Sequence, residues 1–330
     1  MGGLPMTISR NTKWLGFSLA AFLVSLVLLP WAGSAPVSVE RVLSLQPPDY
    51  PIFLELRLSR TLLGLLVGGS LSLAGALFQA MLRDSLATPY TLGVSSGASL
   101  GAILSITAGL PSVMGLPAVW LGALGGAAAV LALVAGVSSQ HGQLSSYRLL
   151  LTGISLNGVC SAMILMIHSV AREHRSISIT QWLLGNIDSI RYPALGGFAA
   201  VAVPVSWILI ARARQWNLLM VGEAWAATRG VDPSALMRTG FLGGSLLTAT
   251  AIALSGPIGF VGLIVPHLVR SRISPDYRLL MPCSFLLGGV LLAVADAIGR
   301  VVLAPAELPA GAIMALLGGP YLVWLVRSRF

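Results

Sequence analysis

Residues able to carry chemistry are few in this chain of 330 residues, and their spacing matches no catalytic or metal site. Cys160 and Cys283 lie far apart in apolar segments, so the sequence predicts two buried thiols rather than a disulfide or a thiolate metal site. The four histidines lack the spacing of metal ligands. They are His141, His168, His174 and His267.

The motifs of hydrolases and nucleotide-binding enzymes are also missing from the sequence. It contains no GxSxG elbow, no HExxH helix and no pair of carboxylates spaced for acid–base catalysis. Lys13 is the only lysine, which excludes a GxxxxGK[ST] phosphate-binding loop within the chain. We therefore predict that the chain is not an enzyme and holds no cofactor or metal. Its energy must come from a partner, unless it is a passive pore.

The composition is that of an integral membrane protein. Hydrophobic residues make up 56% of the chain and charged residues only 9%, and the mean hydropathy is +0.87. A soluble domain carries roughly 25% charged residues, so water could not solvate this surface. The net charge of +9 comes from dispersed arginines, which does not indicate nucleic-acid binding.

The pattern of apolar runs predicts an all-α protein of about ten transmembrane helices, forming a single transmembrane domain over residues 1–330. The first run carries a weak signal-peptide pattern, WAGSA, but its length favours a retained helix. The eighth run is short and contains Pro257 and Pro266. The predicted spans are 14–33, 61–80, 91–109, 115–137, 147–168, 193–211, 236–255, 257–271, 281–299 and 309–326.

The arginines predict how these spans are oriented. If the N-terminus is cytoplasmic, thirteen of the 20 Lys and Arg residues fall on the inner side and seven on the outer side. The acids lie at or beyond the ends of the spans, which gives little support to an ion-coupled carrier. The nearest exception is Asp296, whose spacing from Arg300 predicts an i,i+4 ion pair near the outer interface.

Small residues recur at four-residue spacing within the spans. Gly64-Gly68-Ser72-Ala76 and Gly93-Gly97-Gly101 each form one flat stripe on a helix. Such stripes let helix backbones approach closely, and we predict tight packing there. SLSLAGALFQAML (70–82) and TAIALSGPIGFVGL (250–263) resemble each other weakly and belong to spans of opposite direction, as in an inverted repeat.

One short charged stretch, GEAWAATRGVD (222–232), interrupts the apolar runs on the inner side. Glu223 complements the dipole of a helix start, and Gly230 can adopt the left-handed conformation that ends a helix. Asp232-Pro233 then forms an N-cap followed by proline in the first turn. The stretch is either a well-capped surface loop or, as its capping favours, a rigid knob for a socket on another protein.

With these motifs in place, the chain resembles the FecCD-type permease subunits of ABC importers for iron–siderophores, haem and cobalamin. The similarity covers nearly the whole chain in the right order. It rests on residues 56–102, RLLLTGISLNGVCSA (148–162), QWLLGNI (181–187), GEAWAATRGVD (222–232), SGPIGFVGLIVPHLVR (255–270), residues 277–300 and ELPAGAIMALLGGPYLVWL (307–325).

The resemblance implies the type II importer fold, with both termini in the cytoplasm of a bacterium and the chain in its inner membrane. It implies a homo- or heterodimer of permeases with two separate ATPase subunits that bind ATP and Mg²⁺. It also implies an extracytoplasmic substrate-binding protein. An iron–siderophore complex is the substrate class we expect first, with haem or cobalamin next. A stand-alone secondary transporter is the alternative.

The resemblance also assigns roles to residues. Residues 218–238 would form the coupling-helix loop. Three arginines would dock the binding protein, or else anchor the chain at the membrane interface. Two inner-turn residues would form a candidate gate, or else only pack within their turns. The coupling residues are Gly222, Glu223, Trp225, Ala227, Arg229 and Gly230; the docking residues are Arg57, Arg60 and Arg300; the gate residues are Leu86 and Ser146.

Two inner loops depart from the family pattern. Asp84-Ser85-Leu86-Ala87 stands where the family often has Asn-Pro-Leu-Ala, so a less rigid turn is expected. Pro275-Asp276-Tyr277-Arg278 carries a tyrosine where the family usually has a histidine. Neither change affects the predicted fold.

Overall fold

The computed structural model describes residues 5–33, 35–112, 116–140 and 143–329, and most of them are helical. Ten helices overlap the ten predicted spans, and six of them are long and apolar enough to cross a membrane by length and composition. These ten are α1 (Pro5–Leu28), α4 (Ser59–Leu82), α5 (Val94–Ala108), α6 (Ala118–Ser138), α7 (Ser146–Val170), α9 (Tyr192–Ala211), α12 (Pro233–Ser255), α13 (Val261–Arg272), α14 (Tyr277–Val302) and α15 (Ala310–Arg329).

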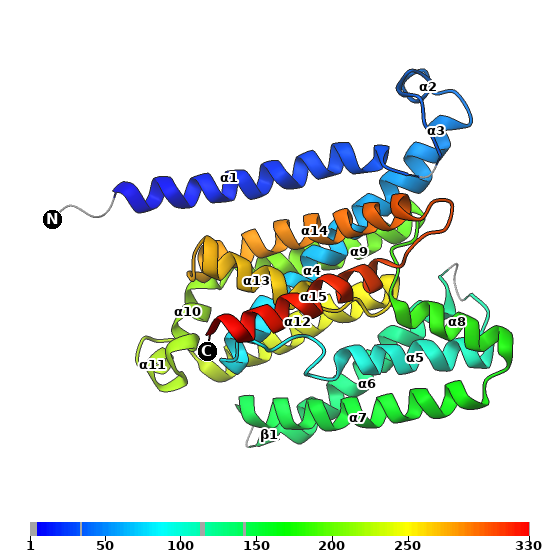
Figure 1. Cartoon of the computed structure of the whole chain (residues 1–330). Helices are drawn as coiled ribbons and strands as arrows, with labels where there is room; N and C mark the ends of the chain where they lie inside the picture. Colours follow the sequence, from blue (N-terminus) through cyan, green and yellow to red (C-terminus); the bar gives the residue numbers. More distant parts are fainter. Residues whose placement is uncertain (1–4, 34, 113–115, 141–142, 330) are drawn as a thin grey trace.

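Shorter elements connect these helices (Figure 1). They are the 3₁₀-helix η1 (Leu29–Trp31), α2 (Val39–Leu43), α3 (Asp49–Pro51), the π-helix η2 (Ile52–Leu58), α8 (Glu173–Leu184), α10 (Ala213–Val221) and α11 (Glu223–Ala227). The strands β1 (Ser139–Gln140) and β2 (Gln143–Leu144) pair antiparallel, with Ser139 opposite Leu144. Apart from this two-residue hairpin, the regular structure of the described residues is helical, as expected for a helical membrane protein.

Helix α4 lies at the centre of the bundle. Its apolar stretch is 89% buried, and it packs on α14, α12 and α13. The predicted small-residue stripe faces α14: a Cβ added at Gly68 would overlap the backbone of Gly288. On another face, a Cβ at Gly75 would overlap the backbone of Gly262 in α13. Lipid gives apolar helices no hydrophobic reason to associate, so such close backbone contact is what holds the bundle together.

Helices α5 and α6 pack against each other in the same way. Gly101 of α5 lies on Gly122 of α6, and Gly97 lies on Gly126, with no room for a side chain at any of the four. The third residue of the predicted stripe is different: Gly93 precedes α5 with φ +77° and packs near Gly153 of α7. In this second stripe, the prediction of close helix packing is therefore confirmed for Gly97 and Gly101 but not for Gly93.

The chain is helical well before the predicted start of the second span. From Asp49 to Leu82 it forms one unbroken helix, in which α3, η2 and α4 follow each other. Glu55 and Arg57 lower the hydropathy of this outer part, which is why the sequence placed the start at residue 61. The outer part of this helix, η2, is a π-helix, in which the turns are wider than in an α-helix. π-helices are rare and are often found at functional sites.

The short eighth span is confirmed as a short helix. The chain from Gly256 to Phe260 is not helical, and Phe260 has φ +69° before α13 begins at Val261. Pro266 lies inside α13, where neighbouring helices cover it. The sequence did not predict α8, because its residues, EHRSISITQWLL, mix polar and apolar types and form no long apolar run. Ile179 is its only buried residue.

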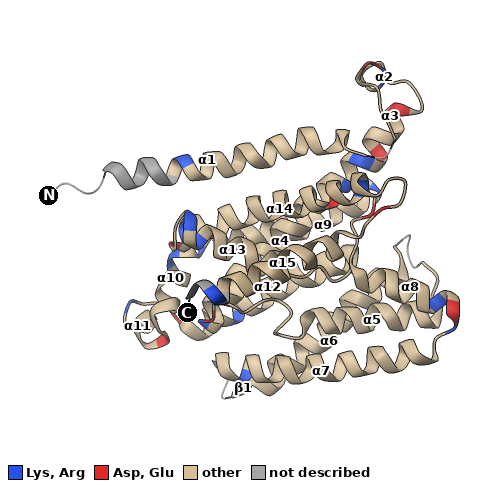
Figure 2. Cartoon of the chain, viewed as in Figure 1, with Lys and Arg blue, Asp and Glu red and all other residues tan. Residues whose placement is uncertain are grey.

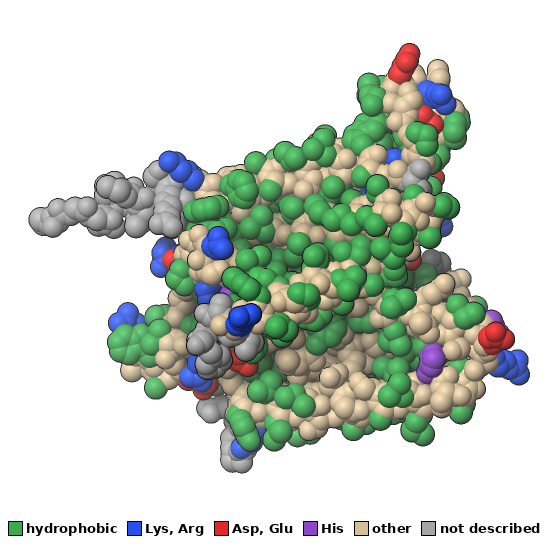
Figure 3. Space-filling view, in the orientation of Figure 1, with side chains coloured by type: hydrophobic (Ala, Val, Ile, Leu, Met, Phe, Trp, Pro, Cys, Tyr) green, Lys and Arg blue, Asp and Glu red, His purple; other side chains and the backbone are tan. Residues whose placement is uncertain are grey.

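Charged residues lie at the two ends of the bundle, and the middle of the helices carries none in the described part of the chain (Figure 2). Apolar side chains cover much of the surface between these ends (Figure 3). The start of α1, the end of α15 and the helices α10 and α11 all lie at one end, and α2, α3 and α8 at the other (Figure 1). We call these the inner and the outer end, following the orientation that the arginines predict.

Two neighbouring glycines of α6 test the role of close packing. An alanine Cβ at Gly126 would overlap the carbonyl oxygen of Gly97, whereas one at Gly125 would meet nothing within 4 Å. We expect Gly126→Ala to lower the melting temperature of the purified chain, because α5 must move away from α6. Gly125→Ala should leave it unchanged or raise stability by about 0.4–1 kcal/mol. Equal melting temperatures would show that this contact does not hold the bundle together.

Candidate functional site

The predicted knob lies at the inner end and consists of α11 and the turn that follows it. α10 ends at Val221, and Gly222 separates it from α11, whose first turn carries Glu223. Gly230 has φ +78°, and the amide of Val231 donates to the carbonyl of Ala226, which closes the turn. Gly230 thus has the predicted left-handed conformation, but α11 already ends at Ala227, so Gly230 closes the turn after the helix and Arg229 lies beyond it.

The start of α12 is fixed by the predicted N-cap. The carboxylate of Asp232 accepts hydrogen bonds from the amides of Ser234 at 2.9 Å and Ala235 at 3.2 Å. Pro233 occupies the first turn, where its missing amide proton costs nothing. The knob is therefore joined to α10 through Gly222 and to α12 through the Asp232 cap.

Charged and aromatic groups of the knob face outward. The guanidinium of Arg229 lies over the ring of Trp225, 4.6 Å from its centroid, and 48% of Trp225 is exposed. Glu223 forms an ion pair at 2.8 Å with Arg83, the residue that caps α4. Both partners are partly exposed, so the pair itself contributes little stability. The knob thus exposes an aromatic ring together with groups of both charges.

The two gate candidates lie near the inner end of α4. The hydroxyl of Ser146, at the start of α7, donates to the carbonyl of Met81 at 2.9 Å. Leu86 is exposed, and its amide donates to the carboxylate of Asp84 at 2.9 Å. Asp84 thus holds the turn in which the sequence lacks the usual proline. A gating role for Leu86 and Ser146 stays a prediction.

A second polar cluster at this end includes the unusual tyrosine. The guanidinium of Arg270 donates to the side-chain oxygen of Gln79 at 2.9 Å and to the hydroxyl of Tyr277 at 3.2 Å. Tyr277 is almost fully buried. The hydroxyl therefore provides a hydrogen-bond acceptor that links the start of α14 to the end of α13 and to α4.

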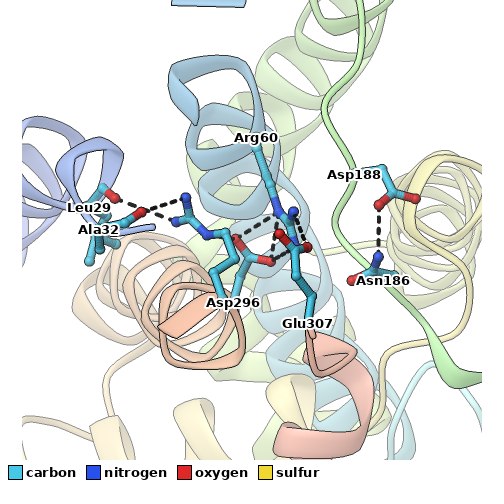
Figure 4. A network of polar contacts seen from close by, with 8 residues as sticks. Leu29, Ala32, Arg60, Asn186, Asp188, Asp296 and Glu307 are labelled. Carbon is cyan, nitrogen blue, oxygen red and sulfur yellow. Dashed lines mark hydrogen bonds and ion pairs between the residues drawn. The ribbon is translucent and has the colours of Figure 1, made fainter. Parts of the chain in front are cut away.

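At the outer end, Arg60 is buried between two carboxylates (Figure 4). Its Nε and Nη2 donate to Oδ1 of Asp296 at 3.0 and 2.9 Å, and its Nη1 donates to Oε2 of Glu307 at 2.7 Å. The side chain of Asp296 is 1% exposed, whereas that of Glu307 is 42% exposed. The pairs link α4 to α14 and to the segment that precedes α15.

Arg300 and Arg57 are buried at the same end. The Nε of Arg300 lies 3.2 Å from Oδ2 of Asp296, so the predicted i,i+4 pair is confirmed. Nη1 of Arg300 donates to the carbonyl of Ala32 at 2.9 Å, and Arg57 donates to the carbonyls of Trp31 and Ala35. These bonds attach the segment after α1 to the bundle.

The three predicted docking arginines are all buried. The sequence suggested three arginines presented to a partner, but their side chains are directed into the chain and bound to its own acceptors. Glu307 is the exposed member of the network. The long-range pairs Arg60–Asp296 and Arg83–Glu223 carried no sequence signal, because their members are far apart in the chain.

Known proteins resemble this chain over most of its length. A model of the FecCD transport family matches residues 19–328. The Hemin transport system permease protein HmuU of Yersinia pestis is 36% identical over 281 residues, covering 84% of each chain. The Fe(3+) dicitrate transport system permease protein FecC of Escherichia coli is 34% identical over 322 residues, covering 95% of this chain and 96% of that one.

The fold is also found among solved structures. A metal-chelate type ABC transporter in an inward-facing conformation superposes with a TM-score of 0.83 and 29% identity, covering 96% of this chain and 99% of the other. The type II importer permease fold is thereby confirmed. The chain belongs to the FecCD transport family and is a multi-pass permease subunit of a bacterial ABC importer, not itself an enzyme.

Proposed function

We propose that this chain forms the membrane pathway of an importer for a large metal chelate, an iron–siderophore complex before haem or cobalamin. The family match over residues 19–328 carries the proposal. The relatives named for hemin, Fe(3+) dicitrate and vitamin B12 support the wider class, since their substrates all hold a metal in an organic ligand. The chain would work as a homo- or heterodimer in the bacterial cytoplasmic membrane, with both termini inside.

Power would come from two separate ATPase subunits that hold ATP and Mg²⁺. The coupling-helix loop, residues 218–238, is the contact we propose for them. Gly222 joins it to α10 and the Asp232 cap joins it to α12, so movement of an ATPase could shift both helices as rigid bodies between inward- and outward-open states. An extracytoplasmic binding protein would deliver the chelate at the outer end.

Uptake by purified components tests the proposal. The chain is reconstituted into proteoliposomes with its ATPase subunits and binding protein. We expect transport of a ferric siderophore only when ATP is supplied on the side of the membrane that carries the ATPase subunits. Hemin and cyanocobalamin serve as comparison substrates. Uptake by this chain alone, driven by an ion gradient, would instead establish a stand-alone secondary transporter.

Reversing the charge of Glu223 tests the coupling role. We expect Glu223→Arg to reduce ATP-driven uptake at least tenfold while the chain still inserts into the membrane, because the new arginine repels Arg83 and alters the proposed ATPase contact. The control is Glu40→Arg, which reverses an exposed acid at the outer end. Normal uptake by Glu223→Arg would rule the role out.

A charge swap separates the two effects of that change. In the double variant Arg83→Glu with Glu223→Arg, the ion pair within the chain is restored with reversed polarity. If Glu223 acts on the ATPase, uptake should stay low in the double variant. Recovery of uptake would show that Glu223 acts only through Arg83.

Docking at the outer end is tested through Glu307 rather than through the buried arginines. If Arg60 receives a carboxylate of the binding protein, Glu307→Gln should strengthen docking up to about fivefold, because it removes the competing acid from a partly exposed pair. Surface plasmon resonance with the immobilised permease measures this. Glu55→Gln removes an exposed acid of the same end and should have no comparable effect.

Asp296→Asn tests the structural role of the same network. It leaves Arg60 and Arg300 buried beside a neutral side chain, and removing one partner of a buried pair typically costs roughly 3–5 kcal/mol. We therefore expect a lower melting temperature from Asp296→Asn but not from Glu307→Gln. Docking that is equal in the Glu307→Gln and Glu55→Gln variants would leave the arginines a structural role only.

A further inference from the structure

A crevice of about 730 Å³ opens between the outer ends of α6, α9 and α12, and its lining includes no residue of the knob or of the arginine network. Its walls are mainly apolar and include Leu116, Trp120, Phe198, Val201 and Leu254. This volume lies within the range of roughly 300–1,000 Å³ found for small-ligand sites. An apolar cavity of this size at the membrane-facing surface of a bundle suits a hydrocarbon chain.

The rim of the crevice carries one cation. Arg191 lines it, is exposed, and has no hydrogen bond or ion pair to its guanidinium within the described part of the chain. Ser189 lines the same rim and adds a hydroxyl. Arg191 is also the residue before α9, so the positive end of that helix dipole lies beside its side chain. These groups together would attract a phosphate.

The position of the crevice along the bundle suits a phosphate at its rim and a hydrocarbon chain between its walls. It lies where α6 and α9 begin and α12 ends, all at the outer end. Trp120 lines the crevice and Tyr192 follows Arg191, and both residue types gather where lipid headgroups meet hydrocarbon. The cation is therefore at headgroup level, and the apolar walls extend toward the hydrocarbon.

We propose that this crevice binds a phospholipid of the outer leaflet, with one acyl chain between α6, α9 and α12 and the phosphate on Arg191. Basic pockets between transmembrane helices on the cytoplasmic side bind lipid headgroups, and an arginine at the outer end would attract a phosphate by the same charge. The lipid would fill a space that the chain leaves open beside Gly197, where an added Cβ would meet nothing within 4 Å. The site does not depend on which substrate the importer carries.

Native mass spectrometry of the full chain in mild detergent tests the site, with dioleoylphosphatidylglycerol as the probe. Arg191→Ala removes the cation, and Gly197→Leu fills the crevice. The matched controls are Arg172→Ala, another exposed outer-end arginine that precedes a helix, and Gly196→Leu, an open position on α9 that does not line the crevice. Unchanged melting temperatures confirm that the variants are folded.

We expect one tightly held lipid whose affinity falls at least fivefold in Arg191→Ala and in Gly197→Leu but not in the two controls. Dioleoylglycerol, which lacks the phosphate, should bind as weakly to the wild type as phosphatidylglycerol does to Arg191→Ala. Glycerol phosphate should not compete, because it lacks the acyl chain.

Three results would overturn the proposal. Equal lipid affinity in all variants would show that the crevice holds no lipid. Full competition by glycerol phosphate would reduce the site to an anion site at Arg191. A change of oligomeric mass in Gly197→Leu without loss of lipid would show that the crevice is a contact between copies of the chain.

Discussion

Close backbone contact is the constraint on which the rest of this bundle depends. A membrane protein cannot gain stability by moving apolar side chains away from lipid, so its helices must instead approach until their backbones touch. Here α4 meets α14 through Gly68 and Gly288 and meets α13 through Gly75 and Gly262. The central helix is thus enclosed by contacts that leave no room for a single added carbon atom, and its position fixes those of its neighbours.

Ion pairs attach both ends of this same helix to other parts of the chain. At its outer end, Arg60 binds Asp296 of α14 and Glu307. At its inner end, Arg83 pairs with Glu223 of the knob. Because α4 has an apolar middle that is closely packed, it can move only together with the helices around it. Any displacement of the knob that preserves the inner pair therefore acts on the centre of the bundle as well as on α10 and α12.

The sequence predicts the features that depend on local pattern. Runs of apolar residues located all ten spans, and Asp232-Pro233 located the start of α12. The features it could not predict depend on the assembled bundle. The π-helical turn that carries Arg57 has no local signature. An arginine facing solvent looks the same in sequence as one buried beside an acid far along the chain, so Arg60 was expected to be exposed.

Burial also determines which groups a partner can reach at each end. Arg60, Asp296 and Arg300 are buried, and together with Glu307 they contain two cations and two anions, so the network is neutral as a whole. Neutrality lowers the cost of burying these charges. Glu307 is the exposed acid of the network, and Arg60 is bonded to it. At the inner end the charges are exposed, and such pairs are weak and readily exchanged. Replacing the inner pair with other contacts would thus cost little, whereas any carboxylate binding Arg60 from outside would have to compete with Glu307.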